Sequence, residues 1–362
     1  CIRDRFKDMR VKSLIINNLR NIESTQIEFN PGLNCFIGDN GAGKTTVLEA
    51  LAVLSKGRSF RSGQIASLIG PETSKFQVFS TVASQADEQH RLGMERGANY
   101  WTARHNGEDV VKLSRLTRLL PHVLLAPSSH TLVSGPPDGR RKYLDWGVFH
   151  VEHAYLTLWR RYSRALKQRN AALRQSNAMV VESLDPQLIE LGEQLHTARE
   201  QHAGRLNAIL QNTLRLFNDT LDGISMSYRK GWAGDDLGEA LRHSAPRDNE
   251  RGSTGPGPHK ADLYLALDGA AARERLSRGE QKSMTAAMIL AQAQLICESG
   301  EKPVLMLDDL SSELDAQHLE RVLSAGMDLD IQVWLTGTRL PPATATYESS
   351  STVFHVEHGR VI

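Results

Sequence analysis

Several segments of the first hundred residues alternate hydrophobic and polar positions with a period of two, which is the pattern of half-buried strands. The alternation and one short apolar run predict strands over residues 11–16, 25–29, 33–37, 76–82 and 92–105. Asn106-Gly107 is a strong signal for a hairpin turn. A Gly-rich stretch follows residue 37, and a helix is predicted from about Lys44 to Leu54, so a strand–loop–helix unit is expected here.

Between residues 140 and 220 the apolar positions instead recur every three or four residues, which predicts helices. The two apolar stripes are Leu158, Tyr162, Ala165, Leu166 and Leu173, then Leu188, Leu191, Leu195, Ala198, Leu206 and Ile209. Asp185-Pro186 lies between the stripes, so we expect it to separate two antiparallel helices. The Gly/Pro-rich residues 247–258 are expected to close this helical region.

The last hundred residues return to short apolar runs. They predict a strand at 263–265, a helix over 277–297 and a buried strand at 304–307. Residues 341–352 are small and polar, which predicts a mobile loop. The sequence therefore mixes strands and helices, and it is expected to be an α/β protein with a helical insertion.

Composition excludes several classes of protein. The chain has 362 residues, 40% of them hydrophobic, which allows two or three globular units. It contains no apolar run long enough for a transmembrane helix, and its first ten residues are charged, unlike a secretory signal. Its three cysteines are isolated, so neither a disulfide framework nor a thiolate zinc site is expected. These features favour a cytoplasmic protein without a membrane partner.

The net charge of +1 conceals an uneven distribution. Residues 140–174 contain nine Lys/Arg and two carboxylates, so this segment carries +7 and the rest of the chain −6. No base-reading motif is present, so the segment is expected to contact DNA phosphates without sequence preference. The residues predicted to contact DNA are Arg140, Arg141, Lys142, Arg160, Arg164 and Lys167, of which the last three share a helix face. A solvated charged surface is the open alternative.

Residues 38–45 fit the phosphate-loop pattern GxxxxGK[ST] between a predicted strand and a predicted helix. Glycines let backbone N–H groups surround phosphates, and the helix N-terminus favours negative charge. Lys44 is predicted to reach the β- and γ-phosphates, and the Thr45 hydroxyl to bind Mg²⁺. The residues expected to bind the nucleotide are Gly38, Asp39, Asn40, Gly41, Ala42, Gly43, Lys44, Thr45 and Thr46.

Two further motifs lie near the C-terminus. The apolar strand 304–307 ends in Asp308 and Asp309, of which the first can hold Mg²⁺ and the second can position the attacking water. Ser277 and Glu280 form a capping box at the start of a long helix. Gly279 weakens the first turn of that helix but would let the backbone approach a phosphate closely. His259 is expected to anchor its loop, and a catalytic role is the alternative.

The segment Leu276–Lys282, LSRGEQK, resembles the signature motif of ABC-type ATPases, and the order of motifs is that of the SMC and RecF-like branch. Asn18–Ile22 and Ser311–Asp315 are similar to the NFRN motif and the D-loop of such heads. Shorter similarities to the RecF family, which with the other motifs span roughly residues 11–340, are Gly57–Arg61, Leu144–Trp146, Gln168–Arg174 and Gly257–Asp262.

The resemblance implies an ABC-type P-loop ATPase head, with a mixed sheet and an antiparallel β subdomain, into which a helical arm is inserted. It places the N-terminal half of the head at 9–135, the arm at 136–250 and the C-terminal half at 251–362. Arg20 and Asn21 would lie beside ATP. In such families two heads enclose ATP, so Ser277 and Gly279 of one copy would face Lys44 and Asp308 of another. Asp309, Lys44 and Ser277 are the expected catalytic residues.

The same resemblance implies an ATP- and Mg²⁺-dependent homodimer that acts on duplex, gapped or single-strand/duplex junction DNA. It also implies single-stranded DNA binding, a role in recombinational repair and the SOS response, loading of the strand-exchange recombinase at gaps, and RecR- and RecO-type partners. Hydrolysis is expected to be slow and to release the dimer, and the protein would associate with the nucleoid.

Three positions depart from the usual ABC pattern. Arg278 and Glu280 alter the signature, and Asp309 replaces the commoner Glu, which is one methylene longer. No glutamine could be assigned to the Mg²⁺-sensing Q-loop, since Gln64 and Gln77 lack supporting context and residues 124–128 contain none. An SMC-like clamp or scaffold with a vestigial ATPase therefore stays open. A transporter subunit and a zinc-hook repair head fit less well, because of the long Arg-rich insertion and the absence of CxxC.

Overall fold

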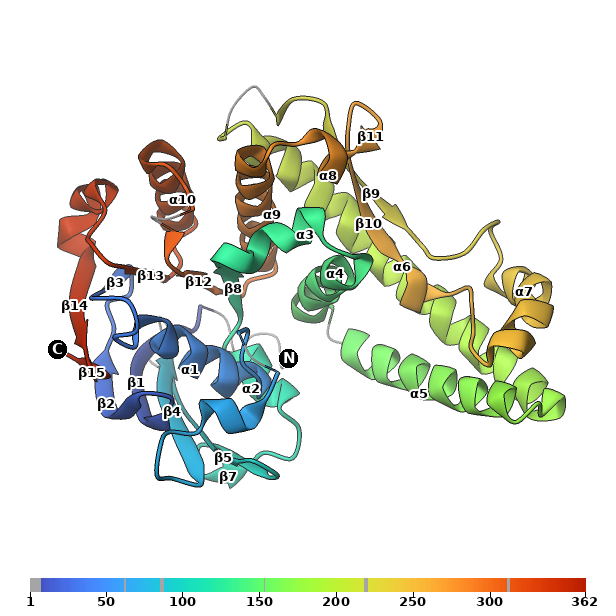
Figure 1. The fold of residues 1–362 in the computed structure, drawn as a ribbon, viewed down its shortest axis with the longest axis horizontal. Coiled ribbons are helices and arrows are strands. Elements are labelled where there is room, and N and C mark those ends of the chain that lie inside the picture. Colours follow the sequence, from blue (N-terminus) through green and yellow to red (C-terminus); the bar gives the residue numbers. More distant parts are fainter. Residues whose placement is uncertain (1–7, 62, 85–87, 153, 218–220, 311–312) are drawn as a thin grey trace. The chain divides into compact units, whose positions relative to one another are not determined.

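A computed structural model describes residues 8–61, 63–84, 88–152, 154–217, 221–310 and 313–362 (Figure 1). They form two compact units, which we describe separately. The first unit takes the chain up to residue 129 and again from 282 to 362, and the second is residues 130–281. The second unit therefore includes residues 251–281, which the sequence assigned to the C-terminal half of the head.

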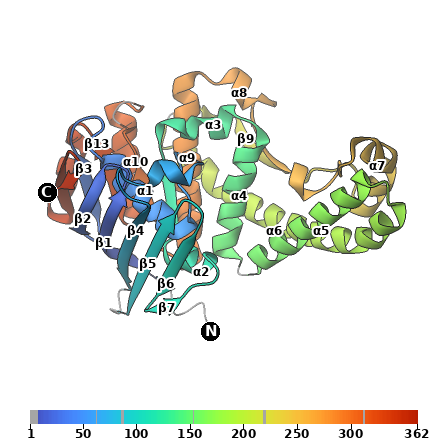
Figure 2. The ribbon, with the colours of Figure 1, turned by 60° about the horizontal axis from the view of Figure 1, so that its bottom comes forward.

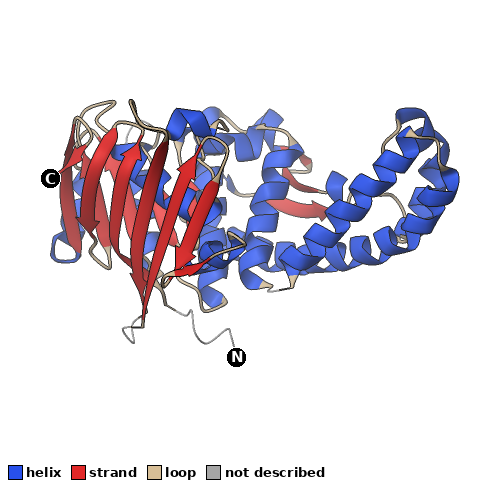
Figure 3. Ribbon diagram, turned by 90° about the horizontal axis from the view of Figure 1, so that it is seen from below, coloured by secondary structure: helices blue, strands red, loops and turns tan. Residues whose placement is uncertain are grey.

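One sheet of the first unit is antiparallel and has the strand order β2-β1-β4-β5-β6-β7 (Figure 3). Its strands are β1 (Arg10–Leu19), β2 (Ile22–Glu28), β4 (Lys75–Ala83), β5 (Gln89–Gly97), β6 (Trp101–His105) and β7 (Glu108–Asp109). Leu14 and Ile16 are fully buried and alternate with more exposed residues, as the period of two predicts. Asn106 and Gly107 have φ values of 52° and 86° and turn β6 into β7, which confirms the predicted hairpin.

The second sheet of this unit has the order β15-β14-β3-β13-β12-β8, and its strand pairs are parallel except at β15. Its strands are β3 (Leu33–Ile37), β8 (His122–Leu125), β12 (Val304–Leu307), β13 (Val333–Gly337), β14 (Ser351–Glu357) and β15 (Arg360–Val361). The carboxyl ends of β3, β12 and β13 thus meet at one edge, where α/β sheets place their ligands. Residues 8–129 and 282–362 both supply strands to this sheet.

Helix α1 (Lys44–Lys56) contacts β1 and β4 of the antiparallel sheet and β13 of the parallel sheet. Almost all of its residues are buried for this reason, including the carboxylate of Glu49. The remaining helical segments that lie wholly in this unit are η2 (Ile65–Leu68), α2 (Ser114–Leu119), α10 (Ala316–Asp328) and η7 (Pro342–Ser350). The rings of Phe29 and Trp334 stack in the core with centroids 4.2 Å apart.

The predicted loop at residues 341–352 is wrong. Residues 342–350 form helical turns and the strand β14 begins at Ser351. The hydroxyl of buried Thr344 donates to the carbonyl of Pro341 at 2.7 Å, so a small polar side chain here stabilises a turn. β14 then pairs with β3 over five positions, which makes it part of the parallel sheet.

The second unit is mainly helical (Figure 2). Its helices are α3 (Thr131–Ser134), α4 (Pro137–Val151), α5 (Tyr155–Arg174), α6 (Ala178–Leu214), α7 (Leu237–Arg251) and α8 (Ala272–Arg275), with the short turn η5 (Pro258–Lys260). A three-stranded sheet, β11 (Ala270–Ala271), β10 (Asp262–Leu267) and β9 (Ile224–Arg229), packs beside them. η3 (Pro127–His130) and α9 (Arg278–Glu298) cross the boundaries between the units.

The predicted helix break at Asp185-Pro186 is also wrong, because α6 continues through Pro186. The chain turns earlier, at Ser176, whose φ is 53°, and Asn177 then caps α6 by accepting from the Val180 N–H. Asp185 instead ties α6 to α5, since it accepts from Arg169 Nε at 2.6 Å. The same buried guanidinium donates to Asp248 and Thr254. This network joins α5, α6, α7 and the loop after α7.

Within the part of the chain that the structure describes, no helix combines the length and apolar character needed to cross a lipid bilayer.

Candidate functional site

The phosphate loop connects β3 to α1 at the carboxyl edge of the parallel sheet. Gly41 and Gly43 have φ values of 80° and 119°, so both occupy backbone conformations that favour glycine. A Cβ on Gly38 would lie 2.1 Å from the carbonyl oxygen of Val356 on β14. The backbone conformation thus favours glycine at two of these positions, and the close approach of β14 requires it at the third.

Lys44 lies across the loop, and its ammonium group donates to the carbonyls of Gly38 at 2.7 Å and Asp39 at 2.8 Å. The side chain is buried, and this desolvation lowers the pKa of Lys44 from its usual value, although Asp309, Asp308 and Asp39 oppose the shift. The nearby carboxylates thus favour the ammonium form, which is the form that attracts a phosphate.

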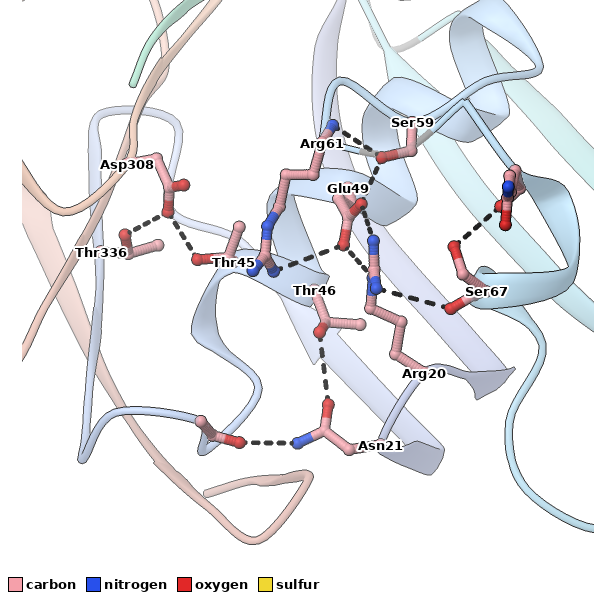
Figure 4. A network of polar contacts seen from close by, with 12 residues as sticks. Arg20, Asn21, Thr45, Thr46, Glu49, Ser59, Arg61, Ser67, Asp308 and Thr336 are labelled. Atoms are coloured by element: carbon pink, nitrogen blue, oxygen red, sulfur yellow. Dashed lines mark hydrogen bonds and ion pairs between the residues drawn. The ribbon is translucent and has the colours of Figure 1, made fainter. Parts of the chain in front are cut away.

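Oxygens from the first turn of α1, the residue after β12 and strand β13 meet at Asp308 (Figure 4). The hydroxyls of Thr45 and Thr336 both donate to Asp308 Oδ1, at 2.7 and 2.8 Å. Burial raises the pKa of Asp308, and the two hydroxyl hydrogen bonds oppose that shift. A buried carboxylate next to a threonine hydroxyl is a hard-oxygen donor set, so these residues fit Mg²⁺, which takes few protein ligands and relies on water and phosphate for the rest.

Arg20 and Asn21, predicted to lie beside the nucleotide, are both held against the phosphate loop and α1. Arg20 donates from Nε and Nη2 to the two oxygens of Glu49, at 2.5 and 2.8 Å. Asn21 donates to the carbonyl of Gly41 at 3.0 Å and accepts from the Thr46 hydroxyl at 3.3 Å. Asn21 therefore links the turn between β1 and β2 to the middle of the loop and to the first turn of α1.

These residues line one cavity of about 310 Å³. Its lining is Arg20, Asn21, Asn40, Gly41, Gly43, Lys44, Thr45, Thr46, Arg61 and Asp309. Six of the nine predicted nucleotide ligands, the NFRN-like residues Arg20 and Asn21, and the second carboxylate thus share one site within the first unit. Gly38, Asp39 and Ala42 instead line a second cavity with residues 355–358. Gln64 and Gln77 are not in this lining, and Gln77 instead donates to Glu95 at 2.8 Å.

Three residues of this site were missed. Arg61 lines the cavity, and its guanidinium lies 3.9 Å from Glu49. Thr336 ends the apolar strand β13, and this position was a usable signal because parallel strands end at one edge. Glu49 lies in an apolar helix segment, and nothing in the sequence around it marks it as a site residue. Its role is visible only in the fold, which places it against Arg20.

Asp309 has a φ of 50°, and its N–H donates to Thr336 Oγ1 at 2.9 Å. Asp is among the few residues that adopt this left-handed conformation readily. The backbone conformation therefore favours Asp over the longer Glu at this position. Further along the D-loop, Glu313 pairs with Lys282 at 2.9 Å and Asp315 caps α10. Ser311 and Ser312 lie outside the described residues.

In the second unit, Ser277 and Glu280 form the predicted capping box. The Ser277 N–H donates to Glu280 Oε2 at 2.8 Å, and the Glu280 N–H donates to Ser277 Oγ at 3.3 Å. Gly279 is exposed, and a Cβ built on it would meet no heavy atom within 4 Å. Packing within the described chain therefore does not explain why this residue is glycine.

Arg140 is a correction to the predicted DNA contacts. Its side chain is buried, and its guanidinium donates to both oxygens of Asp262, at 2.7 and 3.0 Å. A bidentate buried pair leaves no donors for a phosphate on the surface. Arg141 is partly buried and donates to the Ala261 carbonyl, whereas Lys142 is exposed and pairs with Asp138.

Arg160, Arg164 and Lys167 on α5 are exposed, and none of these side chains makes a hydrogen bond or ion pair with another described residue. Tyr162 and Ala165 on the opposite face are buried, as the apolar stripe predicts. The structure therefore presents three cations on one helix face. His259 anchors its loop, since its ring bonds the Tyr162 hydroxyl and the Thr254 carbonyl, and burial lowers its pKa to about 4.

The hairpin of β14 and β15 contacts the phosphate loop directly. The Gly359 N–H donates to the Ala42 carbonyl at 2.8 Å, and a Cβ on Gly359 would lie 2.0 Å from the backbone oxygen of Asn21. Gly359 therefore lies between Asn21 and the phosphate loop, and its lack of a side chain lets the two approach closely.

Substituting Gly359→Ala should weaken ATP binding by about tenfold or more, because the clash and the φ of 79° together store strain of about 1–3 kcal/mol that displaces Asn21. Calorimetric titration with ATP measures the effect. Gly269→Ala is the matched control, since Gly269 has the same φ of 79° but no neighbour within 4 Å of the added Cβ. Equal ATP affinities for the wild type and Gly359→Ala would show that the hairpin does not position the site.

Comparison with known proteins agrees with this geometry. Residues 10–359 match the family profile of the RecF/RecN/SMC N terminal domain. A protein of Xanthomonas axonopodis pv. citri (strain 306), described as DNA replication and repair protein RecF, is 39% identical over 361 residues, which cover 98% of either chain. A protein of Thioalkalivibrio sulfidiphilus (strain HL-EbGR7) with the same description is 39% identical, covering 97% of this chain and 98% of its own.

Solved structures show the same fold. One described as the recombination mediator protein RecF-ATP in the RecFOR pathway has a TM-score of 0.86 at 24% identity, covering 99% of this chain and 98% of its own. A SmcHead bound to the C-winged helix domain of ScpA has a TM-score of 0.58 at 13% identity, covering 97% and 96%.

The fold and the profile match define the class, which is the head domain of the RecF/RecN/SMC proteins, as the sequence predicted. Within that class the two full-length relatives are decisive, and the chain belongs to the RecF family.

Proposed function

We propose that this chain is a DNA-binding ATPase that acts in replication-associated recombinational repair. ATP binding would drive the formation of its homodimer on DNA. The observation that carries the proposal is the convergence of Lys44, Thr45, Asp308 and Thr336 at the end of the parallel sheet. Family membership and the ATP named in the description of a related structure support ATP as the nucleotide.

In this proposal the phosphate loop and Lys44 bind the β- and γ-phosphates, while Thr45 and Asp308 hold Mg²⁺. Mg²⁺ held by these two residues would supply positive charge against the charge that develops on the phosphate oxygens. Asp309 then orients the attacking water and accepts its proton. Arg20 and Asn21 position the loop and α1 through Glu49 and Gly41.

The proposed dimer would bring the signature of one copy to the nucleotide site of the other. Ser277 and Gly279 would complete the site of a second copy, since exposed Gly279 offers its backbone to a phosphate without steric hindrance. The γ-phosphate provides contacts that ADP lacks, so ATP binding closes the dimer and slow hydrolysis opens it. We keep the proposed domains: the two halves of the ATPase head are residues 9–135 and 251–362, and the DNA-binding arm is residues 136–250.

The exposed cations of α5 supply the DNA-binding surface, together with Lys142 and Arg141 at the start of the arm. They suit phosphate contacts on gapped or duplex DNA and at strand junctions. On this proposal the dimer works in the cytoplasm at the nucleoid, helps load the recombinase at gaps and cooperates with RecR and RecO. The RecFOR pathway named for the related structure supports these partners.

A second candidate is a DNA clamp or scaffold with a vestigial ATPase. Asp309 in place of Glu favours it, and neither upstream glutamine lines the cavity.

ATP turnover with and without duplex DNA separates the two candidates. Slow turnover that DNA accelerates, and that Asp309→Asn removes, is the expected result, because Asn cannot accept a proton from water. Phosphate release over time measures it, and Asp328→Asn serves as a control, because this exposed carboxylate lies outside both the cavity and the D-loop. DNA binding without any turnover in the wild type would favour the scaffold instead.

A further inference from the structure

The second unit contains a cavity of about 860 Å³ that the ATPase cycle does not use. It lies between α6, the end of β9 and the turn at residues 257–262, and its volume is in the range of small-molecule sites. Its lining is Pro137, His196, Glu200, Tyr228, Arg229, Lys230, Gly231, Trp232, Asp235, Lys260 and Asp262.

Three aromatic rings form one wall of this cavity. The His196 and Tyr228 rings are stacked with centroids 5.7 Å apart, and Trp232 meets His196 edge to face at 5.2 Å. Trp232 Nε1 and His196 Nδ1 are buried and have no hydrogen-bond partner among the described residues. Both nitrogens are enclosed by protein, so it is the faces of these rings that suit a planar ligand in the cavity.

The motif Gly257–Asp262, which the ATPase cycle also leaves unused, builds the neighbouring wall. The Gly257 N–H donates to the Gly231 carbonyl at 3.1 Å, and a Cβ on Gly231 would lie 2.4 Å from the Gly257 carbonyl oxygen. This close approach brings Lys260 next to Lys230 and Trp232 at the cavity. The exposed Lys260 ammonium makes no hydrogen bond or ion pair with another described residue.

The cavity also contains three carboxylates, two of which have a cation nearby. Asp262 is paired with Arg140 and Asp235 lies 3.9 Å from Lys230, whereas Glu200 lies 3.8 Å from the His196 ring. Lys230 additionally stands 5.1 Å from the centroid of the Trp232 ring. Lys260 is therefore the lining cation with no internal partner, and it is placed where a ligand phosphate could lie beside a ring stacked on the wall.

We propose that this cavity binds one unpaired nucleotide of a DNA single strand, with its base against the Trp232–His196–Tyr228 wall and its phosphate at Lys260. Base–aromatic stacking next to a cation is how proteins hold single strands without reading sequence. The inference rests on the proposed DNA function, since the same unit presents Arg160, Arg164 and Lys167 on α5. The ring wall favours a nucleic acid over an acidic peptide as the occupant, because a nucleotide brings a base that can stack on it.

Fluorescence anisotropy of the full-length protein with ATP tests the proposal, using a short labelled oligothymidylate, the same chain with abasic sites, and a duplex. Trp232→Ala should weaken oligothymidylate binding by about ten- to hundredfold and leave duplex binding within about twofold. Trp232→Phe, which keeps a stacking ring, should recover most of the affinity. Lys260→Gln should weaken binding of the abasic chain as well, because it removes a phosphate contact.

Tyr100→Ala is the matched control, since Tyr100 is an exposed aromatic residue of the first unit. Thermal unfolding of each variant confirms that it is folded. Unchanged oligothymidylate binding by folded Trp232→Ala would overturn the proposal, and so would equal affinity of the wild type for the abasic chain. Competition by an acidic peptide without any effect of Trp232→Ala on DNA would assign the cavity to a protein. Loss of all DNA binding in the wild type would instead reject the proposed function itself.

Discussion

Lys44→Arg and Ser277→Arg are each expected to abolish ATP-dependent dimerisation and leave a folded monomer. In the proposed dimer, two symmetric sites each join a phosphate loop to the signature of the other copy. A hydrogen bond to a charged group contributes about 1.5–3 kcal/mol, so one lost contact per site weakens the dimer by about 3–6 kcal/mol, or roughly 10²–10⁴-fold. Sedimentation velocity with a slowly hydrolysed ATP analogue measures the loss.

The two substitutions act for different reasons. Lys44 is buried with its ammonium 2.7 Å from the Gly38 carbonyl, and a planar guanidinium needs more room than the loop provides there. Arginine at position 277 removes the cap that the Glu280 N–H donates to, and it places a bulky side chain where a phosphate of the other copy must approach. Charge is conserved in the first case, so geometry alone would account for its effect.

Lys12→Arg and Ser183→Arg are the matched controls, because both positions are exposed and lie outside the cavity and the signature. Both should dimerise like the wild type. If dimers form with the ATP analogue in both Lys44→Arg and Ser277→Arg, ATP is not enclosed between two heads and the proposed cycle fails.

Replacing Arg160, Arg164 and Lys167 together by glutamine is expected to reduce duplex DNA affinity and to flatten its salt dependence. Each phosphate contact contributes about 0.9 to the slope of log affinity against log salt, so three contacts contribute about 2.7. Wild-type affinity should therefore fall by at least about 40-fold between 50 and 200 mM salt. Anisotropy of a labelled gapped duplex over this range measures both quantities.

A second triple variant, Arg242, Arg247 and Arg251 to glutamine, changes the net charge equally but lies on α7, where all three residues are exposed. Its salt slope should stay close to that of the wild type. Equal effects of the two triple variants would mean that net charge, and not the α5 face, determines binding. A wild-type affinity that hardly responds to salt would remove the phosphate-contact assignment altogether.

The features that were predicted correctly from the sequence are those that depend on residues close together along the chain. The phosphate loop, the Asn106-Gly107 turn and the Ser277–Glu280 cap each depend on residues a few positions apart. The period of two gave the strands of the antiparallel sheet, although 92–105 contains two strands and a turn where one range was predicted. The family resemblance supplied the order in which these pieces combine.

The remaining features depend on partners far apart along the chain. Arg140 was expected on the surface because its segment is basic, but Asp262 pairs with it across 122 positions. Asp185-Pro186 was expected to break a helix, but α6 continues there and Asp185 joins α5 through Arg169. Glu49 supports Arg20 from inside an apolar helix. Composition and periodicity contain no information on such pairs, since each needs the tertiary fold to bring its members together.

The way the parallel sheet is shared between two distant stretches of chain has a consequence for the newly made protein. β3 and β8 leave the ribosome early, whereas β12, β13 and β14, which lie between and beside them, are synthesised more than 170 residues later. The antiparallel sheet and the inserted unit use nearby segments and can fold during synthesis, but Thr45 meets Asp308 only after β12 has emerged. A growing chain that has not yet reached β12 is therefore unable to assemble the nucleotide site.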